Sequence, residues 1–401
     1  MLPAATRRNV FILALCQALN ITGLSLMITV SAVTGHKLSP DPALSTLPLG
    51  LQFTAAMLTT FPVSLLMKRV GRRIGFSVGA FAALLGGAIM LLGVMKASFV
   101  IFCIGNACIG IGAATAQFYR FAAADAADET FKAKAISLVM VGGLIAAFLG
   151  PLSARWSRLA VEGTEFAGSF AVVMGLGLAA LLLLQLLRIP RPTLEERRDT
   201  GRPLAEIAGN ATFIVAVVGG MIGYATMSFV MTASPLAMMA HHHSFDDNAF
   251  VIQWHVVGMF APSFFTGHLI QRFGVLNVML AGAAALFGCI ATGLSGTEVE
   301  HFWGAMVLLG LGWNFLYIGA SALLTETYRP AERAKVQALN DFLIGFGVSV
   351  ASLSSGALQA GFGWQVVNLG VLPAILAASL AVLWLKLRRR AAAMTAASSE
   401  A

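Results

Sequence analysis

The chain has 401 residues, of which 58% are hydrophobic and only 11% are charged, and its mean hydropathy is +0.82. A soluble globular domain carries roughly a quarter of its residues as Asp, Glu, Lys or Arg, because water must solvate its surface. This composition therefore excludes a soluble protein. The net charge of +8 could indicate a nucleic-acid partner, but the basic residues are concentrated in alternate loops, so we expect no such partner.

Apolar stretches of about twenty residues, long enough to cross a hydrocarbon core of about 30 Å as a helix, recur along the whole chain. We expect twelve transmembrane helices, over residues 10–32, 45–66, 75–95, 98–118, 135–154, 168–187, 211–234, 248–269, 275–294, 302–324, 336–359 and 364–386. With both termini in the cytoplasm, all but four of the 26 Lys and Arg residues lie on the cytoplasmic side, as the positive-inside rule requires. The sequence predicts an all-α, multi-pass protein in the lipid bilayer of a bacterial inner membrane.

The longest polar stretch, residues 188–210, divides the chain into two halves. We expect an N-terminal six-helix bundle over 1–187, a cytoplasmic linker over 188–210 and a C-terminal six-helix bundle over 211–401. The segment beginning at Gly110 aligns with the one beginning at Gly310, and the loop 68–73 aligns with 271–274. These correspondences predict a duplication into two parallel repeats.

The loop after the second span resembles the signature of the major facilitator superfamily, which runs G-x-x-x-D-R-x-G-R-R. The matching residues are Arg69, Gly71, Arg72 and Arg73 in the first copy and Arg272 and Gly274 in the second. Lys68 and Gln271 stand at the acidic position. The resemblance implies a gating role for this loop and a monomeric transporter of two six-helix repeats. We expect no enzymatic activity and no cofactor, since the chain lacks an ATP-binding P-loop pattern.

Polar side chains inside a membrane span are costly and mark functional sites. Met227 and Met231 in span seven, and His255 and Met259 in span eight, are each four residues apart, so each pair shares one helix face. Counting along both spans places Met227 and His255 at similar depth, on helices that a short loop joins. Thioether and imidazole groups suit soft metal ions, Cu(I) above all. The alternative is that the methionines fill gaps in the core.

The MxxxM and HxxxM pairs together resemble the CcoA-type copper importers of alphaproteobacteria, a branch of the same superfamily. The resemblance implies that these four residues bind copper during its import from periplasm to cytoplasm. Copper carriers in either compartment are compatible partners. The loop after span seven adds Met238, Met239, His241, His242 and His243. This group could capture copper on the outer side, or it could simply form a solvated loop.

Riboflavin is the alternative cargo, because related branches with similar motifs have been linked to it. Its isoalloxazine ring would prefer aromatic walls and amides to thioethers. The aromatic side chains that could provide such walls are Phe118, Trp254, Trp313 and Phe315. A membrane sensor that transports nothing is a third interpretation, which the lack of a sizeable soluble domain does not favour.

Three amide side chains are candidates for the walls of a central cavity. In the major facilitator superfamily, helices 1, 4, 7 and 10 line this cavity. Asn20, Gln117 and Asn314 fall in spans one, four and ten. The alternative for each amide is a hydrogen bond that only holds two helices together.

Overall fold

The computed structural model describes residues 4–119, 122–123, 132–189, 201–329 and 332–400, and this part of the chain contains helices and no strand. The elements are α1 (Ala4–Leu38), η1 (Pro42–Leu44), α2 (Leu47–Val70), α3 (Arg72–Met95), α4 (Phe99–Ala116), α6 (Lys132–Ser157), α7 (Ala167–Leu184), α8 (Leu204–Ala208), α9 (Ala211–Ala240), α10 (Phe245–Phe260), α11 (Ser263–Phe273), α12 (Val275–Ser295), α13 (Val299–Thr325), α14 (Arg333–Gly370) and α15 (Leu372–Glu400). Residues 190–200 of the predicted linker lie outside the described residues.

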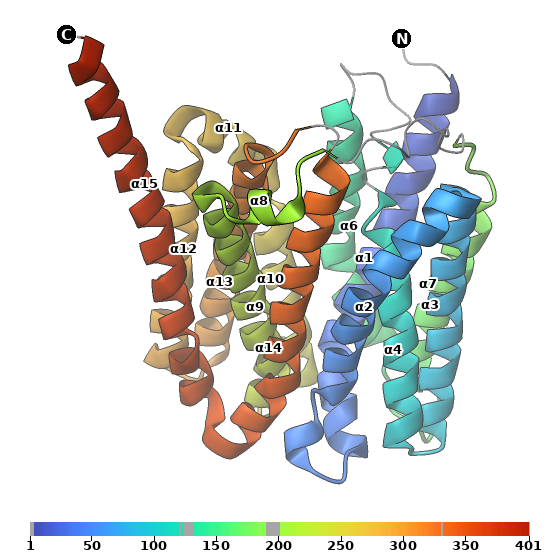
Figure 1. The fold of residues 1–401 in the computed structure, drawn as a ribbon. Helices are drawn as coiled ribbons and strands as arrows, with labels where there is room; N and C mark the ends of the chain where they lie inside the picture. The colour runs from blue at the N-terminus through green and yellow to red at the C-terminus, as the bar shows by residue number, and fades with distance from the viewer. Residues whose placement is uncertain (1–3, 120–121, 124–131, 190–200, 330–331, 401) are drawn as a thin grey trace.

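Each of the twelve predicted spans coincides with a helix or with a bent helix pair. Nine helical segments of the described chain are long and apolar enough to cross a membrane, and α10 with α11 forms a further span that bends by 40°. One of the nine, residues 335–392, contains two spans, because the backbone leaves helical geometry at Gly363 (φ 77°) and turns back into α15 (Figure 1). Helix α6 covers the remaining predicted span. The predicted all-α membrane fold is confirmed.

The two halves of the chain repeat one packing arrangement. In the first half, α1 packs on α6 and α7, α2 packs on α4, and α3 packs on α4 and α7. In the second half, α9 packs on α14 and α15, α10 packs on α13, and α12 packs on α13 and α15. Between the halves, α2 packs on α14 and α6 packs on α10, again as equivalent pairs. The sequence duplication is therefore visible as a repeat in three dimensions.

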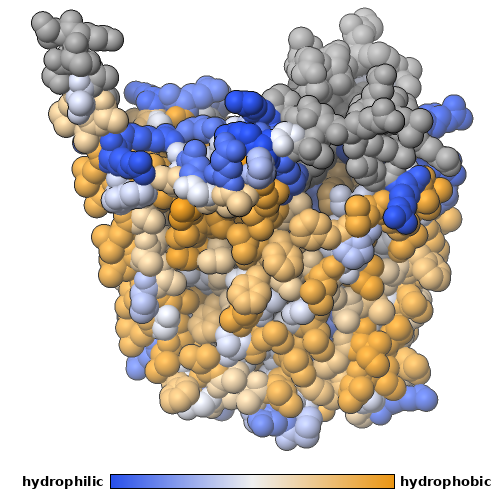
Figure 2. All heavy atoms as spheres, in the orientation of Figure 1, coloured by the Kyte–Doolittle hydropathy of each residue, from blue (hydrophilic) through white to orange (hydrophobic). Residues whose placement is uncertain are grey.

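Helix α1 begins and α15 ends on the same face of the molecule, which we call the terminal face; η1 lies on the opposite face (Figure 1). Figure 2 shows hydrophobic side chains around the middle of the molecule and hydrophilic ones gathered at both faces. Large apolar side chains such as Phe81 (53%) and Leu182 (61%) are exposed. A belt of this kind is what the hydrocarbon core of a bilayer requires.

Gly71 and Gly274 occupy equivalent sharp turns on the terminal face. Gly71 separates α2 from α3 with φ 92° and ψ 159°, and Gly274 separates α11 from α12 with φ 83° and ψ 148°. Residues with a Cβ rarely adopt such positive φ values, whereas glycine does so readily. The turn allows each helix to reverse direction at once, so the start of α3 and of α12 is fixed close to the membrane boundary.

A buried carboxylate fastens the end of the linker to the second half. The Glu332 side chain is 0% exposed and accepts hydrogen bonds from Nε and Nη2 of Arg202, both at 2.8 Å. The backbone N–H groups of Arg202 and Arg329 donate to the same carboxylate at 2.9 Å each. These donors, with the Arg202 guanidinium first, hold the pKa of Glu332 far below its ordinary value.

The depressed pKa of Glu332 makes the stability of this clamp dependent on pH. A carboxyl group whose pKa falls on folding contributes stability above its unfolded pKa of about 4.3 and loses that contribution as the pH falls below it. We expect the Tm of the purified protein to drop more steeply between about pH 5 and about pH 3 for the wild type than for Glu332→Gln. The exposed Glu298→Gln variant is the control and should follow the wild type. Parallel curves for wild type and Glu332→Gln would contradict the role of the clamp.

Candidate transport pathway

The surface between the two halves, which we call the seam, is formed by α2 with α14 and by α6 with α10. Helices α2 and α14 meet near the opposite face, where the Thr46 hydroxyl accepts a hydrogen bond from the Gly356 N–H at 2.9 Å. They also meet nearer the terminal face, where the ring centroids of Phe61 and Phe342 are 6.1 Å apart. A solute that crosses the membrane between the halves must separate these contacts on one side at a time.

Two further polar contacts close the seam near the opposite face. Nε of Arg155, late in α6, donates to Oδ1 of Asp246 at 2.8 Å. Nδ2 of Asn248 donates to the backbone carbonyl of Thr29 at 3.3 Å. Helices α6 and α1 belong to the first half and α10 to the second, so these bonds hold the two halves together at this face.

One face of α9 presents hydroxyl groups to the seam. Leu236 of α9 packs against Ala32 and Leu49 of the first half, which fixes the side of the helix that faces the seam. Thr232 and Ser228 lie four and eight residues earlier on the same face. Their side chains are 1% and 0% exposed, and neither hydroxyl has a hydrogen-bond partner among the described residues. These buried polar groups were not among the predicted site residues.

Four aromatic side chains of the second half form a cluster: Tyr224 of α9, Phe260 of α10, and Trp313 and Tyr317 of α13. The rings of Trp313 and Tyr317 stack with centroids 5.1 Å apart and an interplanar angle of 13°. Tyr224 meets both rings edge-on, at 5.4 and 5.3 Å, and Phe260 meets Trp313 at 6.1 Å. A Cβ added to Gly143 of the first half would lie 3.0 Å from the Phe260 ring, so the cluster reaches the seam.

Of the four aromatic residues proposed for a flavin, only Trp313 belongs to this cluster. Trp254 packs instead against Phe250 and Trp303, with centroids 6.3 and 6.2 Å away. Trp313 is 6% exposed, and its indole N–H has no partner in the described part of the chain. Tyr224 was not a predicted site residue, although it is the only tyrosine of span seven, because the Met227–Met231 pair is the stronger pattern in that span.

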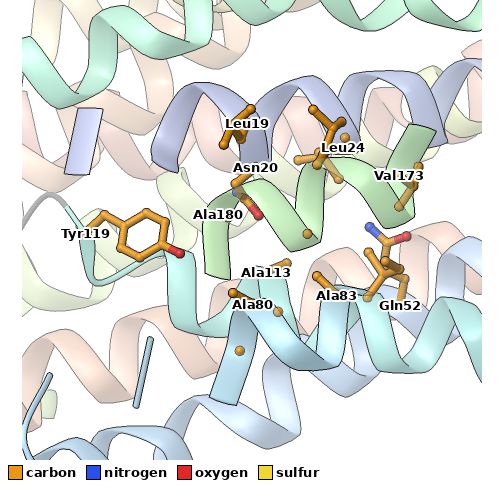
Figure 3. A pocket seen from close by; sticks show the side chains of 16 residues that line it. Leu19, Asn20, Leu24, Gln52, Ala80, Ala83, Ala113, Tyr119, Val173 and Ala180 are labelled. Atoms are coloured by element: carbon orange, nitrogen blue, oxygen red, sulfur yellow. The ribbon is translucent and has the colours of Figure 1, made fainter. Parts of the chain in front are cut away.

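Asn20, a predicted cavity residue, lines an internal cavity of about 50 Å³ within the first half. Asn20 lies between Tyr119 at one end of the cavity and Gln52 at the other (Figure 3). Gln52 is 1% exposed, and neither its Nε2 nor its Oε1 has a partner among the described residues. A site for a drug-sized ligand measures about 300–1,000 Å³, whereas a water needs about 10–15 Å³, so this cavity suits water and is too small for a flavin.

The other two predicted cavity residues lie elsewhere. Gln117 is exposed just beyond the end of α4. Asn314 is 0% exposed: its Nδ2 donates to the Met259 carbonyl at 2.7 Å and to the Ser263 hydroxyl at 2.8 Å, and its Oδ1 accepts from Thr266 at 2.7 Å. Asn314 therefore holds α13 against the bend between α10 and α11.

We expect Asn314→Leu to lower the stability of the protein by about 2 kcal/mol, because leucine leaves the buried Met259 carbonyl without its donor. The decrease is measured as a lower Tm of the purified protein. Asn20→Leu is the matched control, since the Asn20 side chain makes no hydrogen bond with any described residue. Equal shifts in Tm for the two variants would contradict the bracing role of Asn314.

The four predicted metal ligands are all buried in the apolar core of the second half. Met227, Met231, His255 and Met259 are 2%, 3%, 0% and 8% exposed. Nδ1 of His255 contacts the Met306 carbonyl at 2.8 Å, and its Nε2 has no partner among the described residues. No group of three or more His, Cys, Asp or Glu side chains in that part of the chain is placed to hold a metal ion.

The helices that carry the two predicted ligand pairs, spans seven and eight, are not packed along each other in the structure. Helix α9 packs on α13 and α14, and α10 packs on α13 and α6, whereas α9 and α10 make little contact with each other. Helix α13 therefore lies between the two predicted ligand pairs. Equal depth along neighbouring segments of the chain did not imply contact, because the tenth span packs between them.

The predicted outer capture group surrounds the end of α9 on the opposite face. Met238 is buried, Met239 is half-buried, and His241 and His242 are exposed. His243 places Nε2 2.6 Å from the Thr297 carbonyl and its ring against Phe302. These contacts hold the loop between α9 and α10 against the loop between α12 and α13.

The predicted gating loops have different surroundings in the two halves. Arg69 and Arg73 are exposed, Arg72 is half-buried, and Nη2 of Arg73 donates to Oε1 of Gln185 at 3.3 Å. In the second copy, the guanidinium of the exposed Arg272 lies 5.3 Å from the centre of the Phe273 ring. The gating role of both loops stays a prediction.

A two-half bundle of membrane-spanning helices, closed at one face and polar along its seam, defines a multi-pass membrane transporter. The family model of the Major Facilitator Superfamily matches residues 10–234 and 216–401, and the chain belongs to this superfamily. The chain is thus a transporter and no enzyme.

The chain is similar to a "Riboflavin transporter RfnT" of Brucella anthropi, with 45% identity over 394 residues that cover 98% of this chain and 99% of that protein. It is 28% identical to an "Uncharacterized MFS-type transporter YdeG" of Bacillus subtilis, over 92% and 90% of the two chains. Among solved structures, the nucleoside transporter NupG superposes with a TM-score of 0.67 at 14% identity, covering 94% of this chain and 98% of that one. A bacterial homolog of the human lysosomal transporter Spinster superposes with a TM-score of 0.71 at 16% identity, over 97% and 98%. These structures share the fold.

The similarity to a riboflavin transporter overturns the prediction of copper import. The relative matches this chain almost from end to end, and its name assigns it riboflavin. The resemblance to CcoA-type copper importers is unconfirmed, and with it copper as cargo and copper carriers as partners lose their support. Methionine is an ordinary filler of apolar cores, and the buried positions of Met227 and Met231 agree with that explanation.

Proposed function

We propose that this protein imports riboflavin, or a flavin with the same ring system, across a bacterial inner membrane by alternating access. The 45% identity to a riboflavin transporter over 98% of the chain carries the proposal. In this mechanism the bundles 1–187 and 211–401 of one monomer rock against each other and expose the seam to each side in turn. The terminal face is cytoplasmic, because Arg8, Arg69, Arg73 and Arg390 are exposed on it.

The chemistry of the seam supports a flavin as cargo. Isoalloxazine is a flat aromatic ring system, and offset stacking or edge-to-face contact with Trp and Tyr stabilises such rings. The cluster of Tyr224, Phe260, Trp313 and Tyr317 offers these surfaces beside the seam. The unpartnered indole N–H of Trp313 can donate a hydrogen bond to a flavin carbonyl.

The hydroxyl groups of α9 fit the other part of riboflavin, its ribityl chain. Tyr224, Ser228 and Thr232 are spaced four residues apart on one helix face, so each step along the helix is about 6 Å. A ring held at Tyr224 would extend its polyol chain along the hydroxyls of Ser228 and Thr232. While the seam is closed these hydroxyls have no partner among the described residues, and the polyol would supply one.

We expect expression of the chain to allow a riboflavin-auxotrophic bacterium without its own importer to grow on low external riboflavin. Uptake of radiolabelled riboflavin into these cells is the measurement, with cells carrying the empty vector as the control. Excess unlabelled riboflavin should suppress the signal, and copper salts should leave it unchanged. Uptake equal to that of the empty vector would refute the proposed cargo.

A further inference from the structure

The terminal face has a groove in the first half, between the start of α3 and the end of α7, with a volume of about 740 Å³. Basic side chains form one part of its lining: Arg72, Arg73 and Arg188. Ile74 and Phe81 line it further along α3 and are 45% and 53% exposed. The groove therefore joins a positively charged rim to exposed apolar side chains at the edge of the membrane belt.

The second half has a groove at the equivalent place, between the start of α12 and the end of α15, with a volume of about 390 Å³. Lys386, Arg389 and Arg390 line it. Trp384 and Leu387, which lie beside these basic residues on α15 without lining the groove, are 50% and 54% exposed. Tryptophan at such a level is typical of the boundary between lipid headgroups and hydrocarbon.

The duplication relates the two grooves to each other. Each begins at a glycine turn of matching geometry, Gly71 and Gly274, and each lies between the third and sixth helices of its half. The residues that make the grooves basic differ: the first takes them mainly from the start of α3 and the second mainly from the end of α15. Both halves thus have a basic groove at this place, although different positions supply the charge.

No carboxylate lines either groove among the described residues. In both copies of the signature loop, the acidic position next to these grooves holds another residue, Lys68 or Gln271. Nη2 of Arg389 in the second groove is paired with Oε2 of Glu326 at 2.7 Å. In contrast, Nη2 of Arg73 contacts the neutral Gln185, and Nζ of Lys386 donates to Oδ1 of Asn277 at 2.5 Å. Each groove therefore has a basic side chain, Arg73 or Lys386, whose hydrogen-bond partner among the described residues is a neutral amide and does not offset its charge.

We propose that these two grooves bind anionic phospholipids of the leaflet at the terminal face, with the phosphate at the arginines and the acyl chains along the exposed apolar side chains. Basic pockets between transmembrane helices at this level are suited to anionic headgroups. Arginine forms paired hydrogen bonds with phosphate oxygens. A free phosphate ion would use the basic rim and leave the apolar wall without a ligand.

The experiment uses the purified full-length protein and needs no flavin, so its result is independent of the proposed cargo. Lipids that remain bound are counted by native mass spectrometry after incubation with mixed micelles of detergent and either phosphatidylglycerol or phosphatidylcholine, and Tm is measured in parallel. The groove variant combines Arg73→Gln with Arg390→Gln, one exposed arginine from each groove. The control variant combines Arg8→Gln with Arg329→Gln, which removes the same charge from exposed positions on the same face outside both grooves.

We expect the wild type and the control variant to retain at least about twice as much phosphatidylglycerol as phosphatidylcholine, and the groove variant to lose about half of that excess or more. Arg73→Lys with Arg390→Lys should restore binding, because lysine keeps the charge. The proposal is overturned if groove and control variants retain equal amounts of phosphatidylglycerol, or if both lipids bind equally to the wild type. A rise in Tm with inorganic phosphate alone, equal to that with phosphatidylglycerol, would identify a small-anion site instead.

Discussion

We expect Trp313→Ala to take up riboflavin at about one-tenth of the wild-type rate or less at low external concentration. The indole stacks on Tyr317 and meets Tyr224 and Phe260 edge-on, so its removal opens the centre of the aromatic cluster. Each aromatic contact is worth about 0.5–1.5 kcal/mol beyond the area that it buries, and about 1.4 kcal/mol corresponds to a tenfold change in affinity. The loss of two such contacts with the flavin is enough for the expected effect.

Two controls separate a lost binding surface from a damaged fold. Trp313→Phe keeps an aromatic ring but removes the indole N–H, so it should retain part of the uptake. Trp254→Ala removes an equally large ring that packs against Phe250 and Trp303 outside the cluster, so it should transport flavin like the wild type. If Trp254→Ala and Trp313→Ala reduce uptake equally at equal amounts of folded protein, the cluster does not form the flavin site.

The membrane fold could be predicted from the sequence, because a backbone surrounded by lipid can form only a few kinds of structure. A spanning segment must satisfy its own N–H and C=O groups, so an apolar stretch of sufficient length becomes a helix. Hydropathy separated the two spans on either side of Gly363, but it did not reveal the bend between α10 and α11, which falls inside the predicted span 248–269. The repeat could be predicted from the sequence of the loops at Gly71 and Gly274, because a turn with positive φ favours glycine at both positions.

The candidate site was less predictable, because it depends on which helices become neighbours. Periodicity placed Met227 with Met231 and His255 with Met259 on single faces, but it could not show that α13 would lie between the two helices. Trp313 was a candidate from the sequence, whereas its partners Tyr224 and Phe260 come from other helices and needed the packing. Residue type alone also misled, since buried thioethers suit an apolar core as well as a soft metal ion.

We expect Ser228→Ala combined with Thr232→Val to raise the Tm of the purified protein and to lower riboflavin uptake at least about tenfold. Both hydroxyls are buried at the seam without a partner among the described residues. An unsatisfied buried polar group costs about 1–3 kcal/mol, so apolar replacements of similar shape relieve that cost in the closed state. The same replacements remove the groups that the ribityl hydroxyls would meet as the seam opens.

The opposite signs of these two effects distinguish a transport role from a structural one. Ser379→Ala on the peripheral helix α15 is the control, because its hydroxyl donates to the Ile375 carbonyl at 2.8 Å within its own helix. This control should gain no stability and should transport riboflavin like the wild type. A double variant that is more stable and still transports at the wild-type rate would exclude the α9 hydroxyls from the pathway. A double variant that loses both stability and transport would show that the hydroxyls support the fold. The transport role instead requires that a hydroxyl without a partner in the closed state gains a partner in another conformational state.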